Sequence, residues 1–199
     1  MKKIFAALMA LVMALAFMAF KEEGNAGTYK VDHSKSGVTW KGKKVIGGHN
    51  GTINITDGSV GFNGSTITSG TFTIDMTTIK ALDLEGESKG KLEAHLKSPD
   101  FFDAAKFPTS TFKIKKVVKG AGENATVTGA LTIKGITREI SFPITMSAKD
   151  GRLDVNAKDF KVDRTKFGVQ FASKSLKSTM SDKAIDDDFL IGFSLVLTK

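Results

Sequence analysis

The stretch that decides the fold is residues 91–112, KLEAHLKSPDFFDAAKFPTSTF. Leu92, His95 and Leu96 are spaced i, i+3, i+4, so they share one face of a short helix. Most of the remaining chain alternates apolar with polar residues, which is the pattern of half-buried strands. One short helix in an otherwise all-strand chain is typical of a plug that closes the end of a sheet or barrel.

This helix is predicted to span residues 88–97. Ser88 can cap its first turn. Pro99 disfavours helical geometry at the preceding residue, so the helix should end there. Two adjacent aromatic residues, Phe101 and Phe102, follow it. We expect these two rings to anchor the segment to the sheet.

The alternating runs on both sides of this segment predict roughly eight strands, each with one apolar face. Asp57-Gly58 and Asp150-Gly151 are turn signals, and Lys134-Gly135 marks a further turn. Residues 160–188 are predicted to form a long connection. One-sided alternation on every strand indicates a single interior. The helix and the long C-terminal return favour an all-β antiparallel barrel over a sandwich, and an eight-stranded barrel can hold one small ligand.

The inward-facing residues are also the candidate ligand-binding residues, because core-facing and ligand-facing are the same direction in a barrel. They are aliphatic or aromatic and carry no charge. This apolar set is Trp40, Phe72, Ile74, Met76, Phe101, Phe102, Phe112, Leu131, Ile133, Phe142, Ile144, Phe167 and Phe193.

Two histidines complete the candidate site, and each has two interpretations. His95, on the apolar face of the helix, is either a buried residue bonded to a backbone carbonyl or a polar contact to the head of a ligand. His49, in a glycine-rich turn, has the same two interpretations.

Residues 1–26 differ from the rest of the chain. A basic start at Lys2 and Lys3 is followed by the apolar run 4–20, which is typical of a secretory signal peptide. Small residues allow cleavage after Ala16 or Ala26, and the second site leaves a domain over residues 27–199. An uncleaved membrane anchor is the alternative, although the run is at the short limit for spanning a bilayer. We therefore expect a periplasmic or secreted protein.

Composition limits the chemistry. The absence of cysteine excludes disulfides and thiol nucleophiles. The three histidines lie far apart with no carboxylate at ligand spacing, so we predict no metal site and no other cofactor. The net charge of +8 permits attraction to anionic partners, but the lysines mostly occupy the polar positions of strands, so we predict no nucleic-acid binding.

Three segments resemble the YceI-like family of bacterial envelope proteins, and a fourth, residues 160–169 (FKVDRTKFGV), resembles a further segment of it. The three are residues 74–79 (IDMTTI), 92–112 (LEAHLKSPDFFDAAKFPTSTF) and 127–143 (VTGALTIKGITREISFP). The resemblance implies a lipocalin-like barrel with an elongated apolar cavity. It further implies binding of a long-chain isoprenoid or fatty amphiphile for storage or transport, with transient membrane contact during ligand exchange.

Two other functions stay open on the sequence. One is an enzyme acting on the bound lipid, in which His95 or His49 transfers a proton. The other is a structural or interaction protein whose barrel is packed solid. The absence of a recognisable nucleophile or metal cluster favours a protein that is not an enzyme. The oligomeric state is left open.

Overall fold

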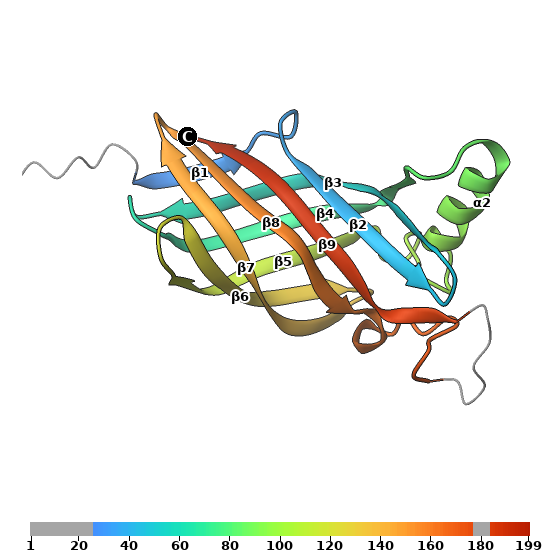
Figure 1. The fold of residues 1–199 in the computed structure, drawn as a ribbon. Coiled ribbons are helices and arrows are strands. Elements are labelled where there is room, and N and C mark those ends of the chain that lie inside the picture. The colour runs from blue at the N-terminus through green and yellow to red at the C-terminus, as the bar shows by residue number, and fades with distance from the viewer. Residues whose placement is uncertain (1–25, 177–183) are drawn as a thin grey trace, which may run out of the picture.

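The computed structural model describes residues 26–176 and 184–199, so residues 1–25 of the predicted signal peptide lie outside the described residues. Within them, nine strands form one antiparallel sheet with an α-helix and a short 3-10 helix (Figure 1). The elements are β1 (Gly27–Val31), β2 (Gly37–Lys44), β3 (Gly48–Phe62), β4 (Ile67–Ala81), α2 (Gly86–Lys97), β5 (Thr109–Lys119), β6 (Asn124–Ile133), β7 (Ile136–Lys149), β8 (Arg152–Asp163), η2 (Arg164–Phe167) and β9 (Ile185–Thr198).

The sheet closes on itself because β3 pairs with both β2 and β4. The strands β1 and β2 share one position in the barrel, since each pairs with a different part of both β3 and β9. Nine strands therefore make a closed barrel of eight positions. The predicted all-β antiparallel barrel with one short helix is confirmed.

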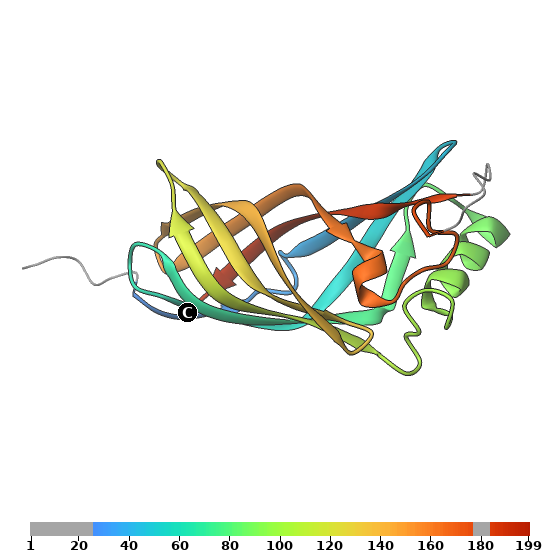
Figure 2. The same ribbon diagram turned by 90° about the horizontal axis from the view of Figure 1, so that it is seen from below.

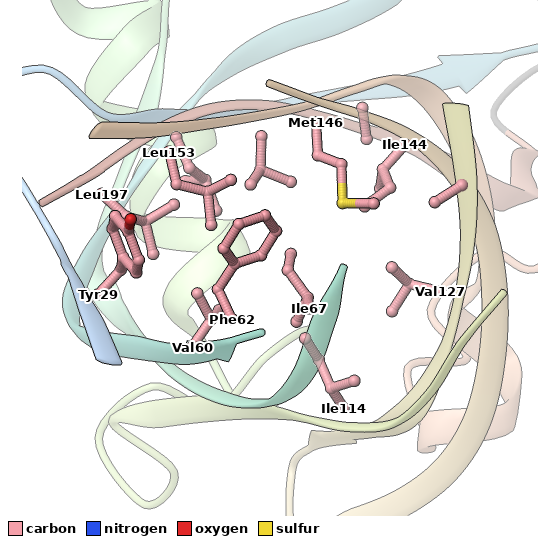
Figure 3. Close-up of a cluster of buried hydrophobic side chains, with 14 of the residues drawn as sticks. Tyr29, Val60, Phe62, Ile67, Ile114, Val127, Ile144, Met146, Leu153 and Leu197 are labelled. Carbon is pink, nitrogen blue, oxygen red and sulfur yellow. The ribbon is translucent and has the colours of Figure 1, made fainter. Parts of the chain in front are cut away.

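One half of the barrel interior is packed with side chains. Tyr29, Leu153 and Leu197 are fully buried there, together with Val60 at 1 % exposure. Figure 3 shows these side chains and their neighbours on opposite walls pointing toward one another. They lie at the end that holds β1 and the C-terminus, so this end of the barrel is closed by its own core.

The opposite end is built from loops and α2. The tip of the β2–β3 hairpin, α2 and the start of β9 all lie at this end in both views (Figures 1 and 2). A second buried cluster, which includes Leu96 and Phe101, joins this end to the barrel wall. We call it the α2 end.

The helix starts earlier than predicted. It begins at Gly86 after Glu85, and the Glu85 side chain makes no capping hydrogen bond, so Ser88 is not the N-cap. The end at Lys97, before Pro99, is as predicted. The helix is held by a tertiary contact instead of a local cap, because the Ala81 amide of β4 donates to Glu93 Oε1 at 3.0 Å.

The predicted turn at Asp57-Gly58 is wrong. Both residues lie inside β3, next to a register shift between Ile55 and Asp57. Glycine is needed there for close packing, since a Cβ on Gly58 would lie 2.6 Å from Val31 Cγ2 and 2.7 Å from Phe72 Cδ1. The predicted turns at Lys134-Gly135 and Asp150-Gly151 are confirmed, with positive φ at all four residues.

The predicted long connection over residues 160–188 is also wrong at both ends. β8 continues to Asp163, and β9 starts at Ile185. The register of β8 against β9 shifts between Ala157 and Phe160, where Asp159 has a φ of 23°. This bulge interrupts the two-residue alternation, so the sequence pattern hides the continuity of the strand.

Closure of the barrel predicts a sharp response to one substitution. A Cβ on Gly51 would overlap the Lys80 carbonyl oxygen of β4 and lie 2.7 Å from the Trp40 ring. We expect Gly51→Ala to lower the free energy of unfolding by about 3 kcal/mol, because the overlap is with backbone that cannot move aside. Urea denaturation measures this.

Gly37→Ala is the matched control, since no atom lies within 4 Å of its added Cβ and its φ is not positive. Equal stability of the two variants would contradict the close approach of β3 and β4 at Gly51.

Candidate functional site

A cavity of about 220 Å³ lies inside the barrel and extends to the α2 end. Every strand except β1 contributes to its wall, as do Leu96 of α2 and the two rings of Phe101 and Phe102. Several inward side chains, including Phe72 and Ile74 of β4, are only partly buried although they face the interior. Partial burial of inward residues means that this half of the barrel is hollow.

Most of the predicted apolar residues line this cavity, because inward and outward residues alternate along each strand. Those in the lining are Trp40, Phe72, Ile74, Met76, Phe101, Phe102, Phe112, Leu131, Ile133, Phe142, Ile144 and Phe193. Their contact with a ligand stays a prediction.

His49 lies outside the lining, at the β2–β3 hairpin. Its Nδ1 is 2.8 Å from Asp83 Oδ2, and its Nε2 is 3.2 Å from Lys44 Nζ. Burial raises the pKa of Asp83, but hydrogen bonds from the Asn50 amide and from His49 outweigh it and hold the pKa below its ordinary value. The ring therefore joins the hairpin to the end of β4 and does not face the interior.

His95 also lies outside the lining, with 37 % of its side chain exposed. Its ring meets Phe101 and Phe171 edge-on, with centroids 5.1 and 4.6 Å away, and Nε2 is 3.9 Å from Asp100 Oδ2. Aromatic edges hold this ring, so the interpretation of His95 as a buried residue bonded to a backbone carbonyl is wrong. Its interpretation as a polar contact to the head of a ligand stays a prediction. His95 supports the cavity wall from behind, because Phe101 is in the lining.

Phe167 is the third candidate outside the lining. It belongs to η2, is 1 % exposed, and packs against Ile133 and Val162. Both of these partners do line the cavity. Phe167 is therefore a second layer behind the wall.

The sequence reasoning missed two kinds of lining residue. The aliphatic and aromatic ones, such as Ile140, Phe160 and Ile191, follow from the same alternation and could have been added. Of the polar ones, Ser110 follows from the alternation of Phe112 and Ile114 on β5, whereas Arg164 and Asp186 carry no such signal. Arg164 lies within the family-like segment 160–169, which was the one indication available.

Arg164 is buried, with 3 % exposure, and its guanidinium binds four backbone carbonyls. Nε donates to Asp186 O at 3.1 Å and Nη2 to Ile185 O at 3.1 Å. Nη1 donates to Val169 O at 2.9 Å and to Phe171 O at 3.0 Å. One side chain thus joins the segment after β8 to the start of β9.

The carboxylate of Asp187 and the ring of Phe101 lie near the charged guanidinium of Arg164. Its Nη2 lies 3.9 Å from Asp187 Oδ1, and its guanidinium stands 5.8 Å from the centroid of the Phe101 ring. Burial lowers the pKa of Arg164 from its ordinary value, and the carboxylates of Asp187, Asp163 and Asp186 oppose this effect. Arginine keeps its charge in proteins, so the α2 end of the cavity holds a fixed cation.

Four phenylalanine rings of the cavity lining pack against one another. Phe142 stacks on Phe160 with centroids 4.1 Å apart and an interplanar angle of 8°. Phe112 and Phe193 pack beside this pair, at 5.4 and 6.0 Å from Phe142. Gly129 makes room for the Phe112 ring, because any Cβ there would overlap it. These rings form part of the cavity wall, whose lining also includes Ile67, Ile114 and Val127 of the packed cluster.

The arrangement suits burial of apolar atoms. Within residues 26–176 and 184–199, no group of three or more His, Cys, Asp or Glu side chains could hold a metal ion. The same residues include no helix that is long and apolar enough to cross a membrane. The wall offers aromatic and aliphatic contacts along its length, with polar groups mainly at Arg164 and Asp186.

A closed antiparallel barrel with an apolar cavity defines the class of barrels that can enclose a small ligand. The family model described as the YceI-like domain matches residues 29–197. The chain therefore belongs to the YceI-like family.

Relatives that are similar in sequence support this family assignment. A UPF0312 protein of Vibrio vulnificus is 30 % identical over 151 residues, which cover 74 % of this chain and 73 % of that protein. A UPF0312 protein of Pseudomonas putida is 32 % identical over 158 residues, 75 % of each chain.

Two solved structures share the fold. One, BcnA of Burkholderia cenocepacia, has a TM-score of 0.68 at 24 % identity and covers 83 % of this chain and 98 % of its own. The other, described as a polyisoprenoid binding domain from Saccharophagus degradans implicated in plant cell wall breakdown, has a TM-score of 0.62 at 14 % identity, covering 85 % and 97 %.

The four carbonyl bonds of Arg164 predict a strong stability effect. We expect Arg164→Met to lower the free energy of unfolding by roughly 3 kcal/mol or more, because buried carbonyls lose charge-assisted hydrogen bonds. Urea denaturation at neutral pH measures it.

Arg152→Met is the control with the same change of charge, and it should have little effect, since Arg152 is exposed and its partner is Asp154 two residues away. Similar losses in the two variants would show that the carbonyl bonds do not stabilise the fold.

Proposed function

We propose that this protein binds a long-chain apolar ligand, such as a polyisoprenoid, a quinone or a fatty amphiphile, inside its barrel. The observation that carries the proposal is a cavity walled almost wholly by aliphatic and aromatic side chains. Burial of apolar surface would drive binding, at about 25 cal/mol per Å² removed from water. Ordering of a flexible chain reduces the net affinity. The neighbour described as a polyisoprenoid binding domain supports the same ligand class.

The size of the cavity bears on how a long chain would fit. Its volume of about 220 Å³ is below the roughly 300–1,000 Å³ of sites for drug-sized ligands. A long chain would therefore have to displace side chains. The rings of Phe160 and Phe193 are the natural ones to move, because they are only partly buried and line the cavity.

The two alternative functions are less well supported. A solidly packed structural barrel conflicts with the hollow half described above. An enzyme would need a reactive group facing the ligand, but His49 and His95 both lie outside the lining. Within the described residues, the lining holds one carboxylate, on Asp186, and it is 3.4 Å from Lys174 Nζ.

We place this binding in the bacterial envelope, where the protein would store or carry its ligand. The basic start and the apolar run 4–20 support export through a signal peptide. Transfer of a ligand of this class in water requires that its chain be shielded, which the barrel interior provides.

Mass spectrometry of an organic extract of the purified protein tests the proposed function directly. We expect an amphiphile with a long hydrocarbon chain, near one molecule per barrel and absent from a mock purification. Failure to find any such molecule, together with no uptake of an anthroyloxy-labelled stearate by delipidated protein, would refute the proposal.

Filling the cavity should block uptake of the labelled stearate. Ile140 of β7 faces the cavity and is partly buried, whereas Thr145 of the same strand is exposed on the outer face. We expect Ile140→Trp to weaken binding by about tenfold or more, since the indole occupies space the chain needs. Fluorescence titration measures the affinity.

Thr145→Trp adds the same ring outside the barrel and should bind like the parent. If Ile140→Trp melts at the parent temperature and binds with parent affinity, the ligand does not lie in this cavity.

A further inference from the structure

Exposed apolar side chains gather at the α2 end. Among the described residues, six large hydrophobic side chains are exposed, and five of them lie there. The five are Val45, Ile46, Leu82, Phe171 and Leu176; Ile46 is the most exposed, at 77 %. The sixth, Val118, lies near the end of β5 at the opposite end of the barrel. Single exposed hydrophobic residues need no explanation, but a set confined to one end does.

Hydrogen bonds between their segments place most of these side chains near one another at the α2 end. Val45 and Ile46 form the tip between β2 and β3, and the Val45 amide donates to Ala184 O at 3.1 Å, just before β9. The Leu82 amide donates to Asn50 O at 2.9 Å on the same hairpin. Leu176 lies near the start of β9, because its amide donates to Ser173 Oγ at 3.3 Å and Ser173 forms a β-bridge with Ile185.

The apolar rim connects to the cavity. The Phe171 ring lies 5.6 Å from Phe101, centroid to centroid, and Phe101 is part of the cavity lining. Ile185, beside Ala184, is also in the lining. The other end of the barrel is filled by its core, so the rim surrounds the end through which a ligand would pass.

The charges at the rim favour an anionic partner. Lys43 and Lys44 directly precede the Val45–Ile46 tip, and Lys43 is exposed and makes no ion pair within the described residues. Three carboxylates nearby are paired: Asp83 with His49, Asp186 with Lys174, and Asp187 with Arg164. Glu85, just before α2, is exposed and makes no ion pair within the described residues, so the anionic preference rests on the two lysines beside the tip. The chain as a whole carries a net charge of +8. Apolar tips next to lysines match an interface of apolar tails and anionic head groups.

We propose that the α2 end docks on the surface of a bilayer that contains anionic phospholipid, with Val45 and Ile46 inserted among the acyl chains and Lys43 at the head groups. Docking would place the cavity against the membrane, so a chain could move between them without crossing water. The inference goes beyond the proposed function, because docking can be measured with no ligand in the barrel.

The test is co-sedimentation of the delipidated protein with vesicles. One set contains phosphatidylcholine alone, and the other contains phosphatidylcholine with phosphatidylglycerol. We expect binding to the anionic set, weak binding to the neutral set, and a loss of binding at high salt, since salt screens exposed charges.

Paired variants localise the surface. Val45→Ser with Ile46→Ser should weaken vesicle binding by about tenfold, because the inserted apolar area is lost. Val118→Ser removes an exposed valine from the opposite end and should bind like the parent. Lys43→Glu should weaken binding severalfold, whereas Lys149→Glu, with the same change of charge in the distant β7–β8 hairpin, should not.

Two results would overturn the proposal. Equal binding by the tip variant and by Val118→Ser would show that the tip does not contact the bilayer. A parent that ignores anionic vesicles but elutes as a dimer, returned to a monomer by the tip substitutions, would make this surface an interface between two copies. Uptake of the labelled stearate in solution is scored separately, so failure of docking leaves the proposed function untouched.

Discussion

The hydrogen-bonded pairing of β3 with β4 is the constraint on which the rest of the structure depends. It joins the strand that follows β2 to the strand at the far edge of the sheet, so the sheet becomes a closed barrel without free edges. Closure requires close backbone approach at Gly51, where no side chain fits. Once the barrel is closed, every inward residue shares one interior.

Side chains fill one half of this interior and leave a cavity in the other half. At the β1 end, Tyr29, Phe62 and Leu153 meet neighbours from the opposite wall and leave a packed core (Figure 3). Toward the α2 end, several inward side chains, such as Trp40, Phe72 and Ile74, remain only partly buried and leave a cavity. The packed core and most of the cavity thus lie in different halves of one barrel.

At the α2 end, the guanidinium of Arg164 is a buried polar group beside the apolar cavity. Arg164 is buried there, yet its donors are taken by backbone carbonyls of the segments on either side of residues 177–183. A buried charge with satisfied donors fixes loop geometry without presenting an unpaired group to the cavity. The apolar rim outside it, from the hairpin tip to Phe171, continues the chemistry of the interior onto the surface.

The sequence by itself determined the strands, the barrel class, the position of the helix C-terminus and most of the cavity wall, because two-residue alternation specifies which side chains face inward. Tertiary structure alone decided the rest. Pairing with β4 keeps the turn signal Asp57-Gly58 inside β3, and the bulge near Asp159 shifts the alternation, so the end of β8 was missed. The contact of Glu93 with Ala81 fixed the position of α2 where Ser88 suggested a cap. His49, His95 and Arg164 depend on partners distant in sequence, and so does the choice of which half of the barrel is hollow. Alternation reports the direction of a side chain, but only the assembled barrel determines what it meets.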